Sequence, residues 1–177
     1  MASYPELQGR VALITGGASG LGLAAARSLA GQGMRVAVAD LDAGAAERAA
    51  MALGPSGGHL AFSGDVASQG DVHGWVAALL ARHGRIDVLI NSAGIPDSFL
   101  PTVEQDVADF RRLVDVHLTG TYLVTQAVAP TMLQQGRGSV INLSSVAGVL
   151  GLARRNAYSA AKAGIGMMTR TMGCEWA

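Results

Sequence analysis

The sequence predicts an α/β protein built on a doubly wound parallel sheet. Three observations predict this class: short apolar runs alternate with stretches of helical periodicity, the apolar runs are apolar almost throughout, and glycines mark several of the junctions. Strands that are apolar on both faces are typical of a parallel sheet covered by helices on each side. The 177 residues fit one domain with enough interior for a core, so residues 1–177 are expected to form a single domain.

Five strands and five helices are expected in alternation. The expected strands are the apolar runs 11–14, 35–39, 59–62, 86–90 and 139–143, of which 59–62 has the weakest pattern. The expected helices are 21–32, 43–53, 69–83, 106–135 and 156–176, and residues 54–58 are expected to form a surface turn. Right-handed crossovers place the strand ends, and any ligand, along one edge of the sheet.

Composition excludes several classes of function. The chain has 13 basic and 13 acidic residues, so no basic field attracts nucleic acid or an anionic membrane. The single cysteine, Cys174, excludes an internal disulfide framework, and the four histidines have no ligand-like spacing, so no metal is expected. The first ten residues lack the apolar core of a signal peptide, and 118–136 carries too many polar residues for a membrane span. A cytoplasmic location is expected.

A glycine-rich loop joins the first expected strand to the first expected helix. Gly16, Gly20 and Gly22 form a Gly-x-x-x-Gly-x-Gly pattern at this junction. Glycine allows a sharp turn and a close approach to a pyrophosphate, and the helix N-terminus adds partial positive charge. The pattern therefore favours a phosphate-binding loop over the alternative, a plain tight turn.

Three polar or small segments follow the next strands at the same edge. Asp40 ends the second strand 18 residues after Gly22, where an acid can bind both hydroxyls of an adenosine ribose and repel a 2′-phosphate, which favours NAD over NADP. Asp65 follows the third strand and could meet an adenine amino group. The alternatives are a solvated turn acid for Asp40 and a capping or turn acid for Asp65. Small residues in Asn91-Ser-Ala-Gly94 would let a cofactor lie close to the backbone.

Tyr158, Lys162 and Ser145 suggest proton transfer at an alcohol oxygen. A free tyrosine hydroxyl has a pKa of about 10 and is a poor acid or base at neutral pH. A lysine four residues later on a helix lies on the same face, and its positive charge favours the tyrosinate. A nearby serine hydroxyl can hold a substrate oxygen beside the tyrosine. A tyrosine and a lysine at this spacing also occur by chance on many helices, so the preceding segments decide the interpretation.

Taken together and in order, these segments resemble the short-chain dehydrogenase/reductase family over essentially the whole chain. The resemblance rests on the glycine loop, Asn91-Ser-Ala-Gly94, Asn142-Leu-Ser-Ser145 and Tyr158-Ser-Ala-Ala-Lys162, which match in order and spacing. It implies a Rossmann-like sheet and an oxidoreductase that transfers a hydride between NAD(H) and an alcohol or ketone. It also implies a homodimer or homotetramer.

The resemblance assigns roles to individual residues. Tyr158 is the expected acid and base, Lys162 tunes it and holds the nicotinamide ribose, and Ser145 holds the substrate oxygen. Ser145 is preferred over Ser144 because it lies thirteen residues before the tyrosine. The expected cofactor-binding residues are Gly16, Ser19, Gly20, Leu21, Gly22, Asp40, Leu41, Asp65, Val66, Asn91, Ala93, Gly94, Tyr158 and Lys162.

Two positions depart from the family pattern. Many members have a second asparagine where this chain has Ser92, and an asparagine supporting a proton-relay water where it has His117. Histidine also donates and accepts hydrogen bonds, so His117 is a fourth candidate catalytic residue, with a new pH dependence near the imidazole pKa. The alternative for His117 is simple packing between helices.

The family pattern normally continues beyond the point where this sequence stops. The downstream segments of the family anchor the nicotinamide carboxamide and form a substrate lid, so the functional protein is expected to be longer. Without them, strand 139–143 would lack a neighbour and the substrate pocket would have an open wall. A C-terminally shortened, catalytically impaired NAD-binding module is therefore the alternative function. A structural or scaffold protein would leave the Ser145, Tyr158 and Lys162 spacing unexplained.

Overall fold

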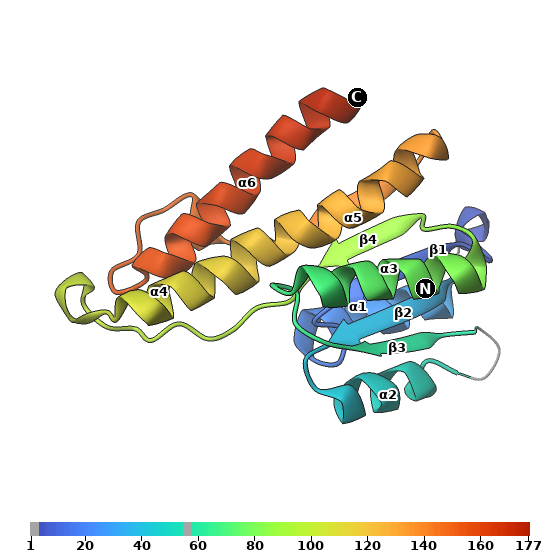
Figure 1. Cartoon of the computed structure of the whole chain (residues 1–177), viewed down its shortest axis with the longest axis horizontal. Helices are drawn as coiled ribbons and strands as arrows, with labels where there is room; N and C mark the ends of the chain where they lie inside the picture. The colour runs from blue at the N-terminus through green and yellow to red at the C-terminus, as the bar shows by residue number, and fades with distance from the viewer. Residues whose placement is uncertain (1–3, 55–57) are drawn as a thin grey trace.

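The computed structural model describes residues 4–54 and 58–177 and has three layers, a central sheet between two layers of helices (Figure 1). The described strands form one parallel sheet in the order β3-β2-β1-β4-β5. Their bounds are Val11–Thr15 for β1, Arg35–Asp40 for β2, Leu60–Ser63 for β3, Val88–Asn91 for β4 and Ser139–Asn142 for β5. The predicted α/β class and the parallel, doubly wound sheet are confirmed.

Helices connect the strands and begin and end close to the predicted positions. They are α1 Gly20–Gly31, α2 Ala43–Ala52, α3 Gln69–His83, α4 Val107–Val114, η3 Asp115–Thr119, α5 Gly120–Gln134 and α6 Asn156–Trp176, with short 3₁₀ turns η1 Pro5–Leu7, η2 Thr102–Glu104 and η4 Val146–Gly148. Side chains cap three of the α-helices: Asp42 accepts from the Ala45 N–H at the start of α2, Ser68 from the Asp71 N–H at the start of α3, and Asp106 from the Ala108 N–H at the start of α4.

The two faces of the sheet bury alternate residues of each strand. In β1, Ala12 and Ile14 pack with residues of α1 and α2, whereas Val11 and Leu13 pack with residues of α3 and α5. These four side chains are fully buried, as expected for a central parallel strand covered on both faces. The sheet order therefore places β1 and β4 in the middle of the molecule, with their carboxyl ends side by side.

The predicted helix 106–135 contains a π-helical turn. The backbone stays helical from α4 into α5, but η3 between them, Asp115–Thr119, has the wider π spacing. A π turn accommodates an extra residue within a helix and is frequent at functional sites. Here it carries His117, which is buried. The predicted surface turn at 54–58 lies partly outside the described residues, since 55–57 are not described.

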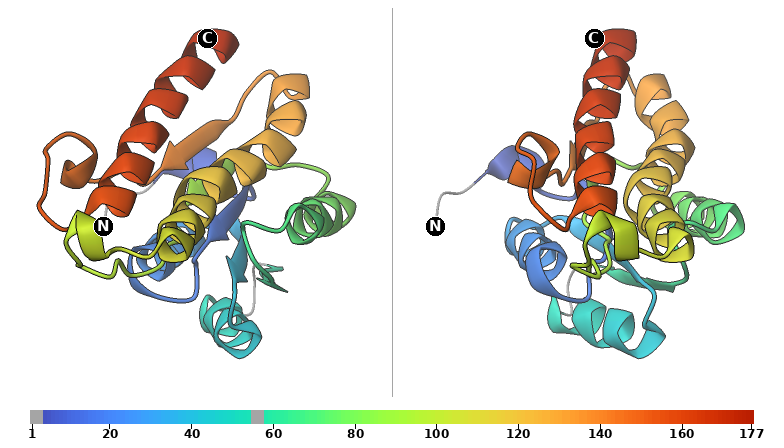
Figure 2. Two further views of the ribbon diagram at one scale, coloured as in Figure 1. Left: turned by 60° about the vertical axis from the view of Figure 1, so that its left-hand side comes forward. Right: turned by 90° about the vertical axis from the view of Figure 1, so that its left-hand side faces the viewer.

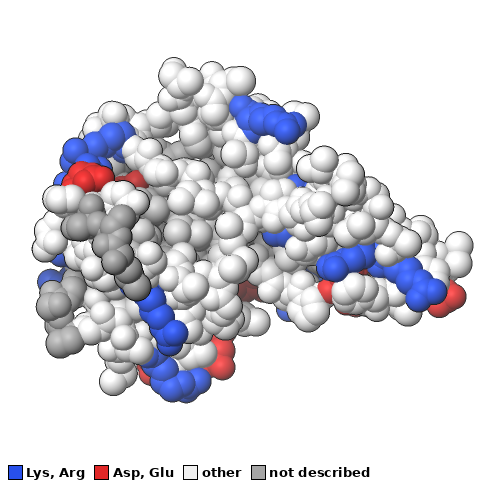
Figure 3. Space-filling model, turned by 180° about the vertical axis from the view of Figure 1, so that it is seen from behind, with Lys and Arg blue, Asp and Glu red and all other residues white. Residues whose placement is uncertain are grey.

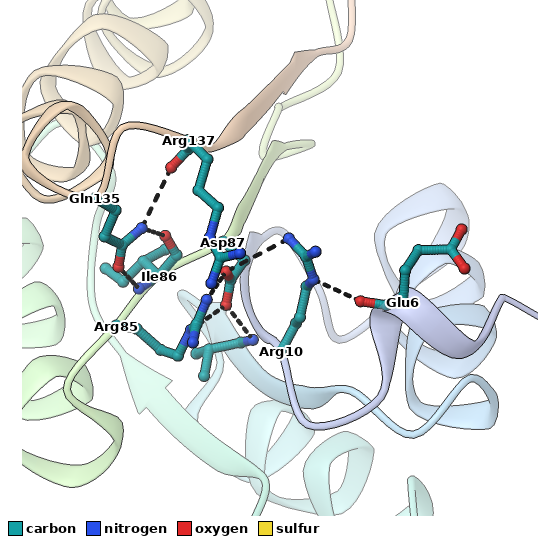
Figure 4. Close-up of polar contacts among 8 residues, drawn as sticks. Glu6, Arg10, Arg85, Ile86, Asp87, Gln135 and Arg137 are labelled. Carbon is teal, nitrogen blue, oxygen red and sulfur yellow. Dashed lines mark hydrogen bonds and ion pairs between the residues drawn. The ribbon is translucent and has the colours of Figure 1, made fainter.

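A buried carboxylate, Asp87, ties together the amino ends of the central strands (Figure 4). Its Oδ2 accepts from the Val11 N–H at 2.9 Å and from the Arg85 Nε–H at 2.8 Å, and Arg10 lies 3.8 Å from Oδ1. Gln135, at the end of α5, joins the same region by donating to the Ile86 carbonyl at 2.8 Å. The polar groups at this end of the sheet thus bond mainly to one another.

Helices α5 and α6 lie on the same flank of the sheet and run in similar directions, and α6 packs against α4 and η3 (Figure 1, Figure 2). β5 is the last described strand on this flank, and Ile141 within it is 44% exposed. On the face shown in Figure 3, basic and acidic side chains lie mostly beside one another on a largely uncharged surface. Within residues 4–54 and 58–177, no helix is long and apolar enough to cross a bilayer, and no group of three acidic, histidine or cysteine side chains could hold a metal.

Candidate functional site

A cavity of about 730 Å³ opens at the carboxyl ends of the strands. Its wall combines the loops that follow all five strands with η3 and α6, so segments far apart in the sequence meet there, as the edge rule for parallel sheets predicts. Most of the predicted site residues line it, namely Gly16, Ser19, Gly20, Leu21, Asp40, Leu41, Asp65, Val66, Ala93, Gly94, His117, Tyr158 and Lys162.

The glycine loop is shaped by close backbone contacts. Gly16 has φ +60°, and a Cβ there would lie 2.8 Å from Ala93 Cα. Gly22, in the first turn of α1, lies so close to the loop that a Cβ would overlap the Gly16 carbonyl. Gly20, with φ +50°, faces open space. Gly16 and Gly22 therefore let the loop fold tightly, and Gly20 leaves room for a ligand beside the helix start.

The N-terminus of α1 is suited to an anion. Ser19 occupies the N-cap position, but its side chain makes no capping hydrogen bond. This differs from α2 and α3, where Asp42 and Ser68 cap the first turn. Uncapped N–H groups and the positive end of the helix dipole together attract phosphate oxygens. A pyrophosphate fits here with no basic side chain from the loop itself.

Asp40 presents its carboxylate at the end of β2. Oδ2 accepts from the Ala18 N–H at 3.1 Å, and Oδ1 from the Asp42 N–H at 3.4 Å, which fixes the group against the glycine loop. Each carboxylate oxygen retains a lone pair for a further donor, such as a ribose hydroxyl. A phosphate at the same point would meet a negative charge.

Asp65 lines the same cavity and also stabilises the turn that follows β3. Its Oδ1 accepts from the Ala67 N–H at 2.9 Å, which matches the alternative interpretation of a turn acid. It also lines the cavity together with Val66 and Trp75, and the indole N–H of Trp75 is held by the Ser63 carbonyl at 3.1 Å. Both interpretations of Asp65 are therefore compatible with its position.

Tyr158 and Lys162 reach the cavity from the first turns of α6. Lys162 is 7% exposed, and its ammonium donates to the Leu143 carbonyl at 2.6 Å. Burial lowers the pKa of Lys162, because desolvation disfavours the charged form. The ammonium nitrogen lies 5.6 Å from the centroid of the Tyr158 ring. The lysine ammonium and the tyrosine ring therefore lie close together on the same wall of the cavity.

His117 is packed between the loop after β4 and Tyr158. Its Nε2 lies 3.0 Å from the Ile95 carbonyl and 3.1 Å from the Ile95 N–H, its ring meets the Tyr158 ring edge-on at 5.4 Å, and its Nδ1 is buried without a partner among the described residues. A Cβ at Gly94 would fall on the imidazole, so this glycine makes room for it. Desolvation lowers the pKa of His117, and the charge of Lys162 acts in the same direction.

Three predicted site residues do not line the cavity. Ser145 starts the η4 turn, where its Oγ accepts from the Ala147 N–H at 3.2 Å. The Asn91 amide donates to Thr125 at 2.9 Å and to Asn142 at 2.8 Å, between β4, β5 and α5. Gly22 serves the loop geometry. Sequence reasoning also missed other residues of the cavity wall, among them Ser92, Ile95, Trp75, Arg112 and Ser144.

Of these, Ser144 had a sequence signal, because it lies beside the predicted serine. In the structure Ser144 lines the cavity, and its hydroxyl donates to the Lys162 carbonyl at 2.9 Å. Thr15 was also missed. It is buried at the end of β1, and its hydroxyl accepts from the N–H groups of Ser92 and Ala93 at 3.2 and 3.3 Å, which fixes the loop after β4 against the glycine loop.

Comparison with known proteins decides the family. The family model for short chain dehydrogenase matches residues 10–177. The chain belongs to this family. Its relatives include the D-threitol dehydrogenase of Mycolicibacterium smegmatis, 40% identical over 97% of this chain and 66% of the relative, and the levodione reductase of Leifsonia aquatica, 36% identical over 94% of this chain and 64% of the relative. This member of the family thus spans about two thirds of the length of such relatives.

Solved structures agree with the fold. A crystal structure of levodione reductase superposes with a TM-score of 0.91 at 36% identity, covering 95% of this chain and 66% of that one. Another relative, the 3-oxoacyl-[acyl-carrier-protein] reductase of Synechocystis, is 38% identical over 97% of this chain and 70% of its own length. The short chain dehydrogenase family uses nicotinamide cofactors, and the glycine loop, the uncapped start of α1 and the room beside Gly20 fit such a group.

Proposed function

We propose that this chain is the nucleotide-binding and proton-transfer part of an NAD-dependent oxidoreductase acting on a small alcohol or ketone. One observation carries the proposal: a single cavity joins the glycine loop and Asp40 at one end to Tyr158 and Lys162 at the other. Asp40 supports NAD over NADP, because its carboxylate would repel a 2′-phosphate. Gly16, Gly20 and the start of α1 would hold the pyrophosphate, and Asp65 and Val66 the adenine.

The bound nicotinamide would supply or accept the hydride. Tyr158 would take the proton from the alcohol oxygen in oxidation and return it to the ketone oxygen in reduction. Lys162, held by the Leu143 carbonyl, would favour the tyrosinate and contact the nicotinamide ribose. His117, beside Tyr158, is proposed to take the place of the family asparagine in the proton relay. A cytoplasmic homodimer or homotetramer remains our expectation.

The test is a Tyr158→Phe variant. We expect it to lower turnover by about 10²- to 10⁴-fold, because the hydroxyl transfers the proton, while NADH affinity changes little. NADH fluorescence titrations measure binding, and a panel of alcohols and ketones measures turnover. Tyr122→Phe is the matched control, since Tyr122 is 43% exposed on α5. Turnover retained in Tyr158→Phe would refute the assignment.

One observation supports a second candidate, an NAD-binding module with impaired catalysis. Ser145, the expected partner of the substrate oxygen, does not line the cavity and instead caps η4. If NADH binds but no alcohol or ketone is turned over by the 177-residue chain, the module is favoured. Ser144→Ala and Ser145→Ala then show which hydroxyl matters in an active form.

A further inference from the structure

Arg155 lies between two aromatic rings at the entrance to α6. Its guanidinium carbon is 4.3 Å from the centroid of the Tyr158 ring and 4.4 Å from the centroid of the Phe99 ring. A cation within about 6 Å of a ring centroid is attracted by the negative ring face, and a planar guanidinium stacks well on it. Arg155 therefore contacts the side chain that is proposed to transfer the proton.

A buried acid fixes this arginine. The Arg155 Nε–H lies 3.4 Å from Asp97 Oδ2, and the Asp97 side chain is 2% exposed against 25% for Arg155. A carboxylate that is buried this deeply needs a positive partner. Asp97 and Phe99 follow β4 whereas Arg155 precedes α6, so the stack clamps two segments together beside the cavity.

The backbone is strained on both sides of the clamp. Phe99 has φ +57° and Arg154 has φ +64°, and within residues 4–54 and 58–177 they alone of the non-glycine residues have positive φ. Left-handed backbone is costly for a bulky residue and persists where surrounding contacts hold it. Both strained residues therefore lie in the two segments that Arg155 joins, Phe99 within the stack and Arg154 next to it.

We propose that Arg155 is a positioning residue for Tyr158: it holds the ring in place and its charge favours the phenolate. The proposal rests on the proposed role of Tyr158 in proton transfer. The other charged or titratable groups around Tyr158 are Lys162 on the same helix, His117 from η3, Arg112 from α4 on the cavity wall, and Asp97 behind the guanidinium. Asp97 offsets part of the field of Arg155, but the guanidinium lies directly on the ring.

Tyrosinate absorbance, followed as pH rises, tests the proposal without requiring turnover. The chain has three tyrosines, so subtracting the titration of Tyr158→Phe isolates the signal of Tyr158. We expect Arg155→Gln to move the midpoint of this signal to higher pH by about one unit, the lower end of the effect of a charge within 4–6 Å. Arg155→Lys should retain most of the wild-type position. Arg154→Gln removes the same charge one residue away on an exposed side chain and should not move the midpoint.

Two results would overturn the proposal: an Arg155→Gln midpoint equal to that of the wild type, or an equal shift in Arg154→Gln. If Arg155→Gln fails to fold because Asp97 is left buried without a partner, the double variant Asp97→Asn/Arg155→Gln removes both charges. A smaller shift in the same direction is then expected, and no shift refutes the proposal.

Activity separates this proposal from the proposed function. In an active form, Arg155→Gln should raise the pH at which kcat/KM for alcohol oxidation reaches half its maximum by the same amount. If Arg155→Gln shifts the tyrosinate midpoint but Tyr158→Phe keeps full activity, the catalytic role of Tyr158 is refuted and the role of Arg155 is retained. If Tyr158→Phe loses turnover but Arg155→Gln leaves the midpoint unchanged, only the role of Arg155 is refuted.

Discussion

The two ends of the sheet treat their polar groups in opposite ways. At the amino end, Asp87 bonds to Val11 and Arg85 and pairs with Arg10 (Figure 4). At the carboxyl end, Lys162 carries a buried charge and His117 Nδ1 is buried without a partner in the described part of the chain. At the amino end the polar groups therefore bond to one another, whereas at the carboxyl end they lie beside a cavity.

This difference indicates that the amino end of the sheet contributes to stability and the carboxyl end to ligand binding. Burial alone would raise the pKa of Asp87, but the hydrogen bonds from Arg85 and Val11 and the charges of both arginines outweigh it and hold the pKa low. Desolvation instead lowers the pKa values of Lys162 and His117, so their charged forms are disfavoured in the fold. Substitutions at the amino end should thus cost stability, and substitutions at the carboxyl end should mainly cost binding or turnover.

Replacing Asp87 should give the largest stability effect. We expect Asp87→Ala to lower the free energy of unfolding by about 3 kcal/mol, because it leaves the Val11 N–H unpaired and two arginines without their acid. The arginines are about one third exposed, 32% for Arg10 and 33% for Arg85, so water compensates them in part. Urea denaturation measures the change, and NADH affinity of the folded fraction should be unchanged.

Arg85→Gln is the matched control for Asp87→Ala. It keeps the carboxylate, the Val11 bond and Arg10, so a loss of about 1 kcal/mol is expected. A loss as large as that of Asp87→Ala would show that the carboxylate is not the centre of the cluster. A large fall in NADH affinity in either variant would contradict the assignment of binding to the carboxyl end alone.

Replacing Asp40 should affect binding and leave the fold. We expect Asp40→Ser to weaken NADH binding about tenfold and to remove the discrimination against a 2′-phosphate, because the ribose loses a charged acceptor. Fluorescence titrations with NADH and NADPH measure both effects. Asp42→Asn changes a neighbouring acid that caps α2 and should preserve the preference. Stronger rejection of NADPH in Asp40→Ser would contradict the role of Asp40.

Replacing Lys162 should raise stability while it lowers function. Lys162→Met removes a desolvated charge, so we expect a gain of about 1 kcal/mol in the free energy of unfolding at pH 7, with turnover lost. The pKa of Lys162 is lowered by folding, so the wild type bears this cost at pH values below the folded pKa and is relieved of it as pH rises toward the unfolded value. The gain should therefore shrink toward pH 10 in denaturant titrations, and a marked loss of stability at pH 7 would contradict it.

Part of this arrangement was predictable from the sequence, because apolar runs mark the strands and right-handed crossovers place the strand ends along one edge of the sheet. Asp40 and Gly16 follow their strands directly, so their place on the cavity wall needed no packing information. Ser145 was placed by spacing alone, and one residue of difference along an irregular turn decides whether Ser144 or Ser145 faces the cavity. Whether either serine holds substrate stays a prediction.

Other features depend on tertiary packing and leave no local pattern. The π turn at Asp115–Thr119 has the same apolar spacing as an ordinary helix, so the sequence predicted one helix there. The stack of Phe99, Arg155 and Tyr158 joins residues far apart in the chain, and neither Phe99 nor Arg155 belongs to a motif. These features shape the carboxyl end of the sheet, whereas its glycine loop could be predicted from the sequence.

Replacing His117 should give a pH-dependent effect on stability that is absent at neutral pH and appears only as the pH falls. The pKa of His117 is lowered by folding, so its contribution to stability is present above the unfolded pKa of about 6.5 and is lost as pH falls through the folded value. The His117→Asn variant has no imidazole at this position and therefore lacks this pH-dependent contribution to stability. The stability difference, wild type minus variant, should therefore fall between pH 7 and pH 5 by at most about 1.4 kcal/mol per pH unit. His73→Asn, on an exposed position of α3, is the control and should keep the wild-type dependence. Parallel stability curves for wild type and His117→Asn would show that burial of this imidazole does not oppose its protonation. Of His117 and Lys162, only Lys162 would then have a charged form that is disfavoured by burial.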